Sequence, residues 1–179
     1  MGATEPWYSS QSPLTWKDGK SDGYTWANAP YYTGNGSTHS WSKYTDSDYT
    51  VLQPEDDAAT VQLGSSWRMP TIGDWNELNN PDNTTWTWEN GSGSSGLSTG
   101  GVKGYKVAKK TDSSVYIFLP AAGYRNATHV TNQGASGRYW SSSLYTPNTL
   151  HGRCFEFDSS NRYASSNSRN YGFTVRPVQ

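Results

Sequence analysis

The chain has very little cysteine and no long apolar run, and both absences limit what it can be. Its single cysteine, Cys154, permits no disulfide within the chain, so packing and hydrogen bonds must hold the fold together. No segment is long and apolar enough to span a membrane, and no signal peptide or lipobox is visible. Direct membrane insertion is therefore not expected.

Lysine is missing from the last third of the chain. The net charge is −1, without the basic excess typical of nucleic-acid binders, so we expect no nucleic-acid partner. Residues 111–179 nevertheless hold six arginines and three acids but no lysine, whereas seven lysines precede them. Binding interfaces favour arginine over lysine because the planar guanidinium stacks and pairs through two hydrogen bonds. The split indicates an arginine-bearing recognition face near the C-terminus.

Aliphatic residues are also sparse, but aromatic ones replace them. Only 32% of the residues are hydrophobic, yet there are nine tryptophans and thirteen tyrosines. Aromatic side chains bury a large area each, so 179 residues suffice for a single domain, 1–179, with a sizeable core. Tryptophans spread through the first fifty residues predict irregular structure and short strands anchored on that core.

The secondary-structure signals fall into two early helices and a later set of strands. Pro54–Gly64 is predicted as one helix, and Thr71, with Asp74 three residues later, is typical of the N-cap of a second helix that ends before Pro81. The predicted strands cover residues 84–88, 103–109, 115–119, 138–142, 153–157 and 172–178, with a Gly-Ser loop at 90–101. This order predicts an α+β domain with antiparallel sheets and no disulfides.

No pattern indicates catalysis or a metal. The histidines lie far apart without cysteine or carboxylate at ligand spacing, and no glycine-rich loop carries a phosphate-binding ending. Ser141–Ser143 lacks a strand–turn–helix context and a histidine partner. Arg153 could lower the pKa of the neighbouring Cys154 thiol, but a lone cysteine on a strand is usually inert. We therefore predict a protein that is not an enzyme and uses no cofactor or metal.

The last third points instead to binding. Strand phrases at 118–123, 139–142 and 171–177 alternate with stretches of Asn, Ser, Tyr, Arg and His. This alternation predicts a rigid scaffold that carries recognition loops. The aromatic residues expected to belong to the scaffold are Trp67, Trp75, Trp140, Phe155 and Phe157.

Several phrases, in order, resemble the Fibrobacter succinogenes major paralogous domain. They are DDAA at 56–59, LG at 63–64, WRMPT at 67–71, FLPAAGYR at 118–125, YWSS at 139–142 and GFTVRPV at 172–178. The resemblance covers about residues 44–179 and implies a C-type lectin-like fold related to the formylglycine-generating enzyme branch. The first forty residues match only loosely.

Within that family the chain is most similar to variable proteins of diversity-generating retroelements, found in gut Bacteroides and their phages. Those systems mutate adenines, typically in AAY codons, which can become Tyr, Asn, Ser, His, Arg, Asp, Thr, Cys and others but not Lys, Gln, Met, Trp or Glu. Between Leu144 and Asn170 only Glu156 falls outside the reachable set. The resemblance thus implies a variable region of about residues 124–176 and explains why lysine is absent there.

The chain also departs from its wider relatives. The paired cysteines and the calcium–sugar motifs of animal C-type lectins are absent, as are the catalytic cysteines of formylglycine-generating enzymes. Calcium-dependent sugar binding and oxidase activity therefore do not carry over.

These observations lead to one main hypothesis and two alternatives. The main hypothesis is a ligand- or receptor-binding protein, displayed outside the cell or on a phage particle, whose partner is a surface protein or glycan of another cell. Loops around Arg125–His129, Tyr145–Arg153 and Asn161–Asn170 are expected to gather on one face. The expected ligand-binding residues are Arg125, Asn126, His129, Tyr145, Asn148, His151, Arg153, Arg162, Tyr163, Asn167 and Asn170. The first alternative is a non-diversified structural or adhesin module of a surface lipoprotein, fimbrial tip or phage tail fibre. A degenerate formylglycine-generating relative ranks third, and the oligomeric state stays open.

Overall fold

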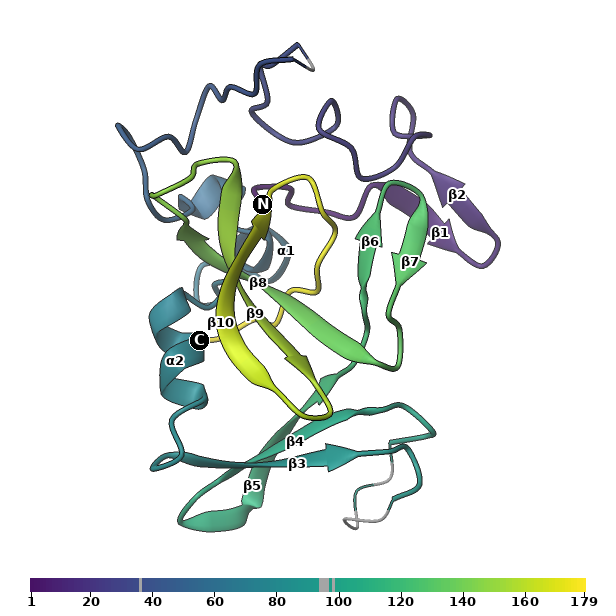
Figure 1. Ribbon diagram of the computed structural model, residues 1–179, viewed down its shortest axis with the longest axis vertical. Helices are drawn as coiled ribbons and strands as arrows, with labels where there is room; N and C mark the ends of the chain where they lie inside the picture. The colour runs from purple at the N-terminus through teal and green to yellow at the C-terminus, as the bar shows by residue number, and fades with distance from the viewer. Residues whose placement is uncertain (36, 94–96, 98) are drawn as a thin grey trace.

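Short helices and antiparallel strands make up the chain. The computed structural model describes residues 1–35, 37–93, 97 and 99–179 (Figure 1). Its helical elements are η1 (Pro54–Asp56), α1 (Ala58–Leu63) and α2 (Ile72–Leu78). Its strands are β1 (Tyr8–Gln11), β2 (Leu14–Trp16), β3 (Thr84–Glu89), β4 (Gly104–Lys109), β5 (Asp112–Pro120), β6 (Tyr124–Asn126), β7 (His129–Thr131), β8 (Ser136–Leu144), β9 (His151–Asp158) and β10 (Arg162–Ser168).

All strand pairs within the sheets are antiparallel, in the orders β1-β2, β3-β4-β5, β6-β7 and β10-β9-β8. The predicted combination of two α-helices with antiparallel sheets is therefore confirmed, although the described part is mostly β. None of the helices in the described ranges has the length and apolarity needed to cross a membrane.

Of the two predicted helices, the second is confirmed and the first is not. The second, α2, has Thr71 as its N-cap: the Thr71 hydroxyl accepts the Asp74 amide while the Asp74 carboxylate accepts the Thr71 amide, so the predicted cap is confirmed. The first is wrong as a single helix. Asp57 adopts an extended conformation (φ −85°, ψ 113°) that separates η1 from α1. Its carboxylate caps α1 and also accepts the Met69 amide, and these bonds favour the break.

Most of the predicted strands are present, but two predictions at the C-terminal end are wrong. Residues 172–178 form isolated bridges rather than a strand, because Gly172, Thr174 and Val178 each pair with a different part of the chain. Residues 161–170, expected to be a loop, contain β10, which pairs along its whole length with β9. The predicted loop at 90–101 includes positions 94–96 and 98, which lie outside the described residues.

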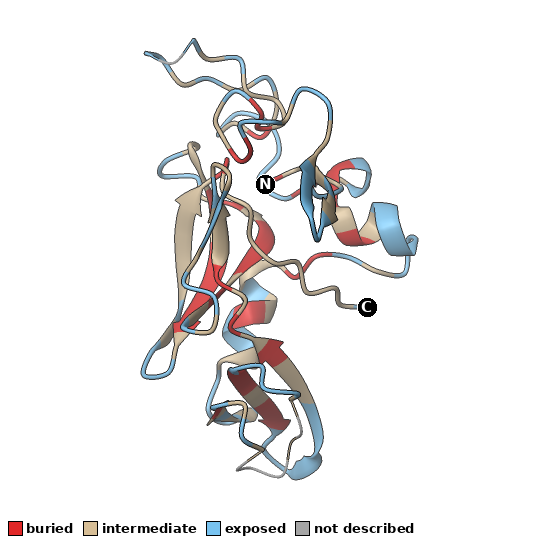
Figure 2. Cartoon of the chain, turned by 90° about the vertical axis from the view of Figure 1, so that its right-hand side faces the viewer, coloured by how far each residue is buried: buried red, intermediate tan, exposed pale blue. Residues whose placement is uncertain are grey.

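One side of the β10-β9-β8 sheet packs on α2 and on the β3-β4-β5 sheet. Trp75 of α2 stacks on Phe155 of β9, with ring centroids 5.1 Å apart and planes 9° apart. Phe157, two residues along the same side, contacts Tyr105 of β4 edge to face. Gly137 on β8 leaves room for the Phe157 ring, which a side chain at that position would overlap. The burial of Trp75, Phe155 and Phe157 confirms the scaffold role expected for them. Figure 2 shows buried stretches of the strands in red.

The opposite side of the same sheet is covered only towards one end. There Cys154, Trp140 and Leu144 pack with Met1 and Tyr44 in a second apolar cluster. A third cluster, around stacked Trp7 and Tyr24, joins the β1-β2 hairpin to the N-terminal loops (Figure 1). The tryptophans Trp7, Trp16 and Trp41 belong to this cluster, as the sequence predicted for N-terminal anchors.

The buried side chain of Arg169 contacts several segments of the chain at once. Its side chain is 1% exposed, and its guanidinium lies 3.7 Å from the centre of the Trp41 ring. It donates hydrogen bonds to the carbonyl oxygens of Tyr44 (2.9 Å), Thr149 (3.2 Å) and Lys43 (3.3 Å). Burial lowers its pKa to about 10, which still leaves it charged at neutral pH. One side chain therefore fixes the N-terminal loops, the β8–β9 connection and the end of β10.

The buried carboxylate of Asp56, the last residue of η1, also connects separate segments of the chain. Asp56 accepts hydrogen bonds from the hydroxyls of Tyr31 and Tyr44, and Lys43 Nζ lies 2.6 Å from its Oδ2 atom. Burial by itself raises the pKa of Asp56, but the hydrogen bonds from Lys43, Tyr31 and Tyr44 outweigh it and hold this pKa below its usual value.

Arg169→Ala should lower the free energy of unfolding by about 3 kcal/mol or more, because three carbonyl groups lose their donor and a cavity forms on Trp41. Urea denaturation followed by tryptophan fluorescence measures the change. Arg153→Ala, at a partly exposed position of β9, is the control and should cost less than about 1 kcal/mol. Equal urea midpoints for the two variants would contradict the structural role of Arg169.

The Asp56 cluster predicts a loss of stability in acid. A carboxyl with a lowered folded-state pKa stabilises the fold above its unfolded pKa, about 4, and this contribution disappears as the pH falls through the folded-state pKa. Between about pH 6 and pH 3 the wild type should lose about 1 kcal/mol more than Asp56→Asn, which is itself less stable at the higher pH. Urea titrations at both pH values test this, and parallel losses would disprove it.

Candidate functional site: the Arg138 face

The β10-β9-β8 sheet continues sideways through bridging segments. Residues 172–174 run beside β8, with the Trp140 amide 3.0 Å from the Thr174 carbonyl and the Thr174 amide 3.0 Å from the Arg138 carbonyl. On its other side Gly172 exchanges two backbone hydrogen bonds with Arg125 of β6. The β6-β7 hairpin thus extends the sheet, as Figure 1 shows.

A row of three side chains crosses the sheet on the side not covered by α2. Tyr163 of β10 pairs in register with Glu156 of β9, which pairs with Arg138 of β8. Directly paired residues of antiparallel strands point to the same side, and neighbouring strands lie about 4.8 Å apart, so the row is about 10 Å long. We call the surface formed by Tyr124, Arg138, Glu156, Tyr163 and Asn167 the Arg138 face.

Arg138 occupies the middle of this face. Its guanidinium lies 3.9 Å from the centre of the Tyr124 ring, and its Nε atom is 3.5 Å from Glu156 Oε2. Within the described ranges its two terminal nitrogens have no hydrogen-bond acceptor in the protein. The stacked ring fixes the guanidinium plane, so those nitrogens are positioned donors available to a ligand.

Glu156 is the buried carboxylate beside it, 9% exposed. Its Oε1 atom accepts hydrogen bonds from Asn167 Nδ2 (2.9 Å) and from the Cys154 thiol (3.4 Å). Burial, followed by the nearby Glu156 charge, raises the pKa of the Cys154 thiol well above its ordinary value. Arg153 does not lower it as the sequence suggested, because successive residues of β9 point to opposite sides.

The hairpin widens the Arg138 face. Asn126 and His129 form a register pair, both are exposed, and Asn126 points to the same side of the hairpin as Tyr124. Behind Tyr124 lie Tyr171 and Phe173, whose ring centroids are 5.5 and 5.8 Å from that of Tyr124. The face therefore has an aromatic end and an exposed polar margin.

The structure divides the expected binding residues between two sides, so the expectation that they gather on one face is wrong. Four of them belong to the Arg138 face or its margin: Asn126, His129, Tyr163 and Asn167. Tyr145, His151 and Arg153 cluster on the opposite side, where the guanidinium lies 4.6 Å from the Tyr145 ring centre. The cause is register: Arg153 pairs with Ser166 and His151 with Ser168, one residue out of step with Asn167.

The remaining four expected residues have other surroundings. Arg162 donates to Asn79 Oδ1 (2.8 Å) beneath Trp86, and Arg125 lies on the Tyr8 ring. Asn148 is exposed, and its side chain accepts the Leu150 amide.

Asn170 requires a correction. It is 5% exposed, and its side chain donates to the Tyr24 carbonyl, so it supports the fold and does not belong to the surface.

Sequence reasoning missed the most central residues of this face. Tyr124, Arg138 and Glu156 were not among the expected binding residues. Arg138 stands two residues before the scaffold residue Trp140, and Glu156 directly follows the scaffold residue Phe155 on the opposite side of the strand. The alternation of side chains between the two sides of β8 and β9 could therefore have identified Arg138 and Glu156 from the sequence. The contact with Tyr124 comes from a distant segment and had no such signal.

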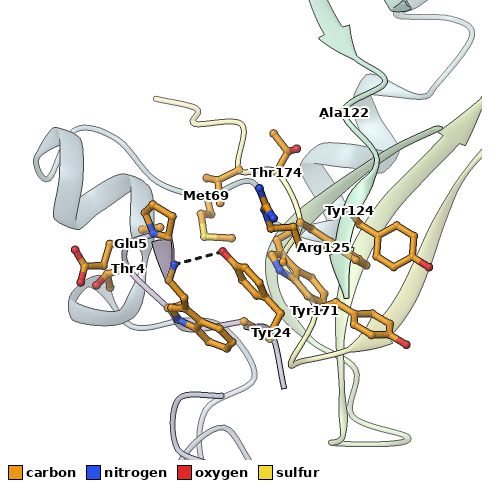
Figure 3. A pocket seen from close by; sticks show the side chains of 18 of the residues that line it. Thr4, Glu5, Tyr24, Met69, Ala122, Tyr124, Arg125, Tyr171 and Thr174 are labelled. Atoms are coloured by element: carbon orange, nitrogen blue, oxygen red, sulfur yellow. Dashed lines mark hydrogen bonds between the residues drawn. The ribbon is translucent and has the colours of Figure 1, made fainter. Parts of the chain in front are cut away.

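A separate cleft lies next to the face. Its volume is about 630 Å³, and its lining includes residues 1–8, 171–175 and 177. Figure 3 shows Tyr24, held by the Trp7 amide at 3.4 Å, and Arg125 at this cleft, while the hydroxyls of Tyr124 and Tyr171 point away from it. Its lining is mostly apolar and aromatic, in contrast to the polar Arg138 face.

Across the described part of the chain, no three histidine, cysteine or acidic side chains come together as a metal site would require. The carboxylates of Asp56 and Asp57, which are adjacent in the sequence, are occupied by the hydrogen bonds described above.

Comparison with known families gives one match. A family described as a domain of unknown function, DUF8237, matches residues 105–178, the part of the chain that contains the Arg138 face. No curated protein and no solved structure matches the chain.

The burial of Cys154 predicts an unreactive thiol. In the folded protein at about pH 8 it should react with a thiol-specific disulfide reagent at least about a hundred times more slowly than in about 6 M guanidinium chloride, because the thiolate is rare and the sulfur is 0% exposed. Absorbance of the released thiolate measures both rates. Similar rates would show that Cys154 is accessible.

Proposed function

We propose that the chain is a non-enzymatic ligand-binding domain on a C-type lectin-like scaffold, and that it binds through the Arg138 face. One observation carries the proposal. A guanidinium stacked on Tyr124 has free donors beside a buried carboxylate, on a sheet whose core is independent of those side chains. The expected partner is a surface protein or glycan of another cell, met outside the cell or on a phage particle.

The residue types of the face support a recognition role. Tyrosine supplies rigid contact area at a low cost in conformational entropy, while asparagine and serine adapt their hydrogen bonds to a partner. Tyr163 is 51% exposed and lies near the start of β10. Ser165 and Asn167, two small polar residues of the same strand, lie on the same side as Tyr163. Such a surface is typical of paratopes rather than of catalytic sites.

We further propose that the domain is the variable protein of a diversity-generating retroelement. Tyr163, Ser165 and Asn167 are partly or largely exposed, and all three are reachable from AAY codons by adenine mutation. Glu156, which is not reachable, would stay fixed at the centre of the face and hold its neighbours in place. Diversification would then change Tyr163, Ser165 and Asn167, while the Glu156 carboxylate between them and Arg138 stays the same.

A non-diversified structural or adhesin module is the second candidate, and a specific observation favours it. Arg169, Asn170 and Cys154 lie inside the expected variable region, yet all three are at most 5% exposed. Fewer positions than expected could therefore vary without damage to the fold. The gene neighbourhood separates the two: a reverse transcriptase and a template repeat differing at adenines support diversification, and their absence supports the module.

The binding role is tested on the chain itself. Tyr163→Ala and Arg138→Lys should each weaken binding of the labelled protein to intact bacterial cells at least about tenfold, as measured by flow cytometry, because each removes a central contact. The melting temperature should change by no more than about 3 °C, since neither side chain belongs to a core cluster.

Two controls match these variants. Tyr116→Ala removes an exposed tyrosine of β5, and Arg68→Lys alters an arginine–carboxylate pair with Asp74 away from the face. Both controls should bind like the wild type. Binding that survives Tyr163→Ala and Arg138→Lys would rule out the Arg138 face as the binding surface.

A further inference from the structure

We infer that the ligand of the Arg138 face is a neutral saccharide, bound without a metal ion; this rests on the proposed binding function. The first reason is charge. The positive Arg138 is balanced by Glu156 at 3.5 Å, and Tyr163 and Asn167 are uncharged. The other carboxylate on this side of β9, Asp158, already accepts the backbone amides of Ser160 and Asn161. An anionic ligand would find no surplus of positive charge here.

The second reason is the kind of hydrogen-bonding groups. Guanidinium, carboxylate and carboxamide are planar groups, and together they offer both donors and acceptors. Both terminal nitrogens of Arg138 are free to donate in the described structure, whereas Glu156 Oε2 has only the long 3.5 Å contact with Arg138 Nε. Neighbouring hydroxyl groups of a sugar each donate and accept, and their spacing suits planar groups that bond through two atoms. The face therefore complements a polyol better than a ligand that only accepts or only donates.

The third reason is the position of the aromatic rings. Tyr163 stands at one end of the row and Tyr124, beneath Arg138, at the other, with the polar groups between them. The C–H faces of a sugar ring are apolar and pack on aromatic surfaces, while its hydroxyl edge remains free to bond the groups between.

Size also favours a saccharide over a folded protein. A stable protein interface buries about 800 Å² on each partner. The row from Tyr163 to Arg138 spans about 10 Å, which suits a few linked sugar rings better than a protein surface.

The test is isothermal titration calorimetry of the full chain in EDTA-containing buffer. The probes are cellotetraose, mannotetraose, xylotetraose and chitotetraose, with a heparin tetrasaccharide as the anionic comparison. At least one neutral tetrasaccharide should bind, and the heparin tetrasaccharide should not. Arg138→Lys and Glu156→Gln should weaken that binding at least about tenfold, and Arg68→Lys should leave it unchanged.

Glu156 is buried, so the Glu156→Gln variant is used only if its circular dichroism matches the wild type; the exposed Tyr163→Ala variant, also expected to lose at least about tenfold, keeps the test decisive in either case. The inference is overturned if none of the four neutral probes binds, if binding requires calcium, or if Arg138→Lys and Tyr163→Ala leave it unchanged.

Treatment of the target cells separates this inference from the proposed function. Periodate cleaves vicinal diols, so it should abolish Tyr163-dependent cell binding if the ligand is a saccharide with free neighbouring hydroxyl groups. Cell binding that depends on Tyr163 but is removed by protease and not by periodate identifies a protein ligand, which overturns the saccharide and leaves the binding function standing. Cell binding that does not depend on Tyr163 would contradict both the saccharide inference and the proposed binding function of the Arg138 face.

Discussion

The fold depends on a charge placed where charges are costly. Arg169 carries a guanidinium into the interior, and no carboxylate forms an ion pair with it in the described structure. It is stabilised by three backbone carbonyls and a tryptophan ring. The carbonyls belong to segments without regular secondary structure, which have few hydrogen bonds of their own. A donor that reaches several of them at once can order loops that a sheet cannot.

The parts of the fold that the sequence predicted are those set by local chemistry. Thr71 and Asp74 cap α2 within four residues of each other, and the alternation of β9 reflects one side packed on Trp75. Strand β10 was missed because its half-exposed sides need no apolar alternation; its conformation comes from pairing with β9. The single helix predicted for 54–64 failed because Asp57 bonds the distant Met69 amide, a contact no local pattern contains.

The candidate site shows the same division. Composition predicted that recognition residues would lie in the last third, and two of the expected residues, Tyr163 and Asn167, lie on the Arg138 face. Composition does not show how β9 and β10 pair, so residues of these strands that point to opposite sides of the sheet were grouped together. Asn170 was misassigned because its side-chain amide donates a hydrogen bond to the backbone carbonyl of Tyr24, 146 residues away in sequence.

Strand β10 has a further consequence for how such a protein could be used. It is a seven-residue edge strand between two fixed points, the Asp158 turn and the Arg169 anchor, and its side chains contribute little to the apolar clusters. Its sequence could be exchanged as a cassette while the path of the chain stays the same. Since no disulfide is needed, libraries of such cassettes could be selected in a reducing compartment, where antibody domains lose their cross-links.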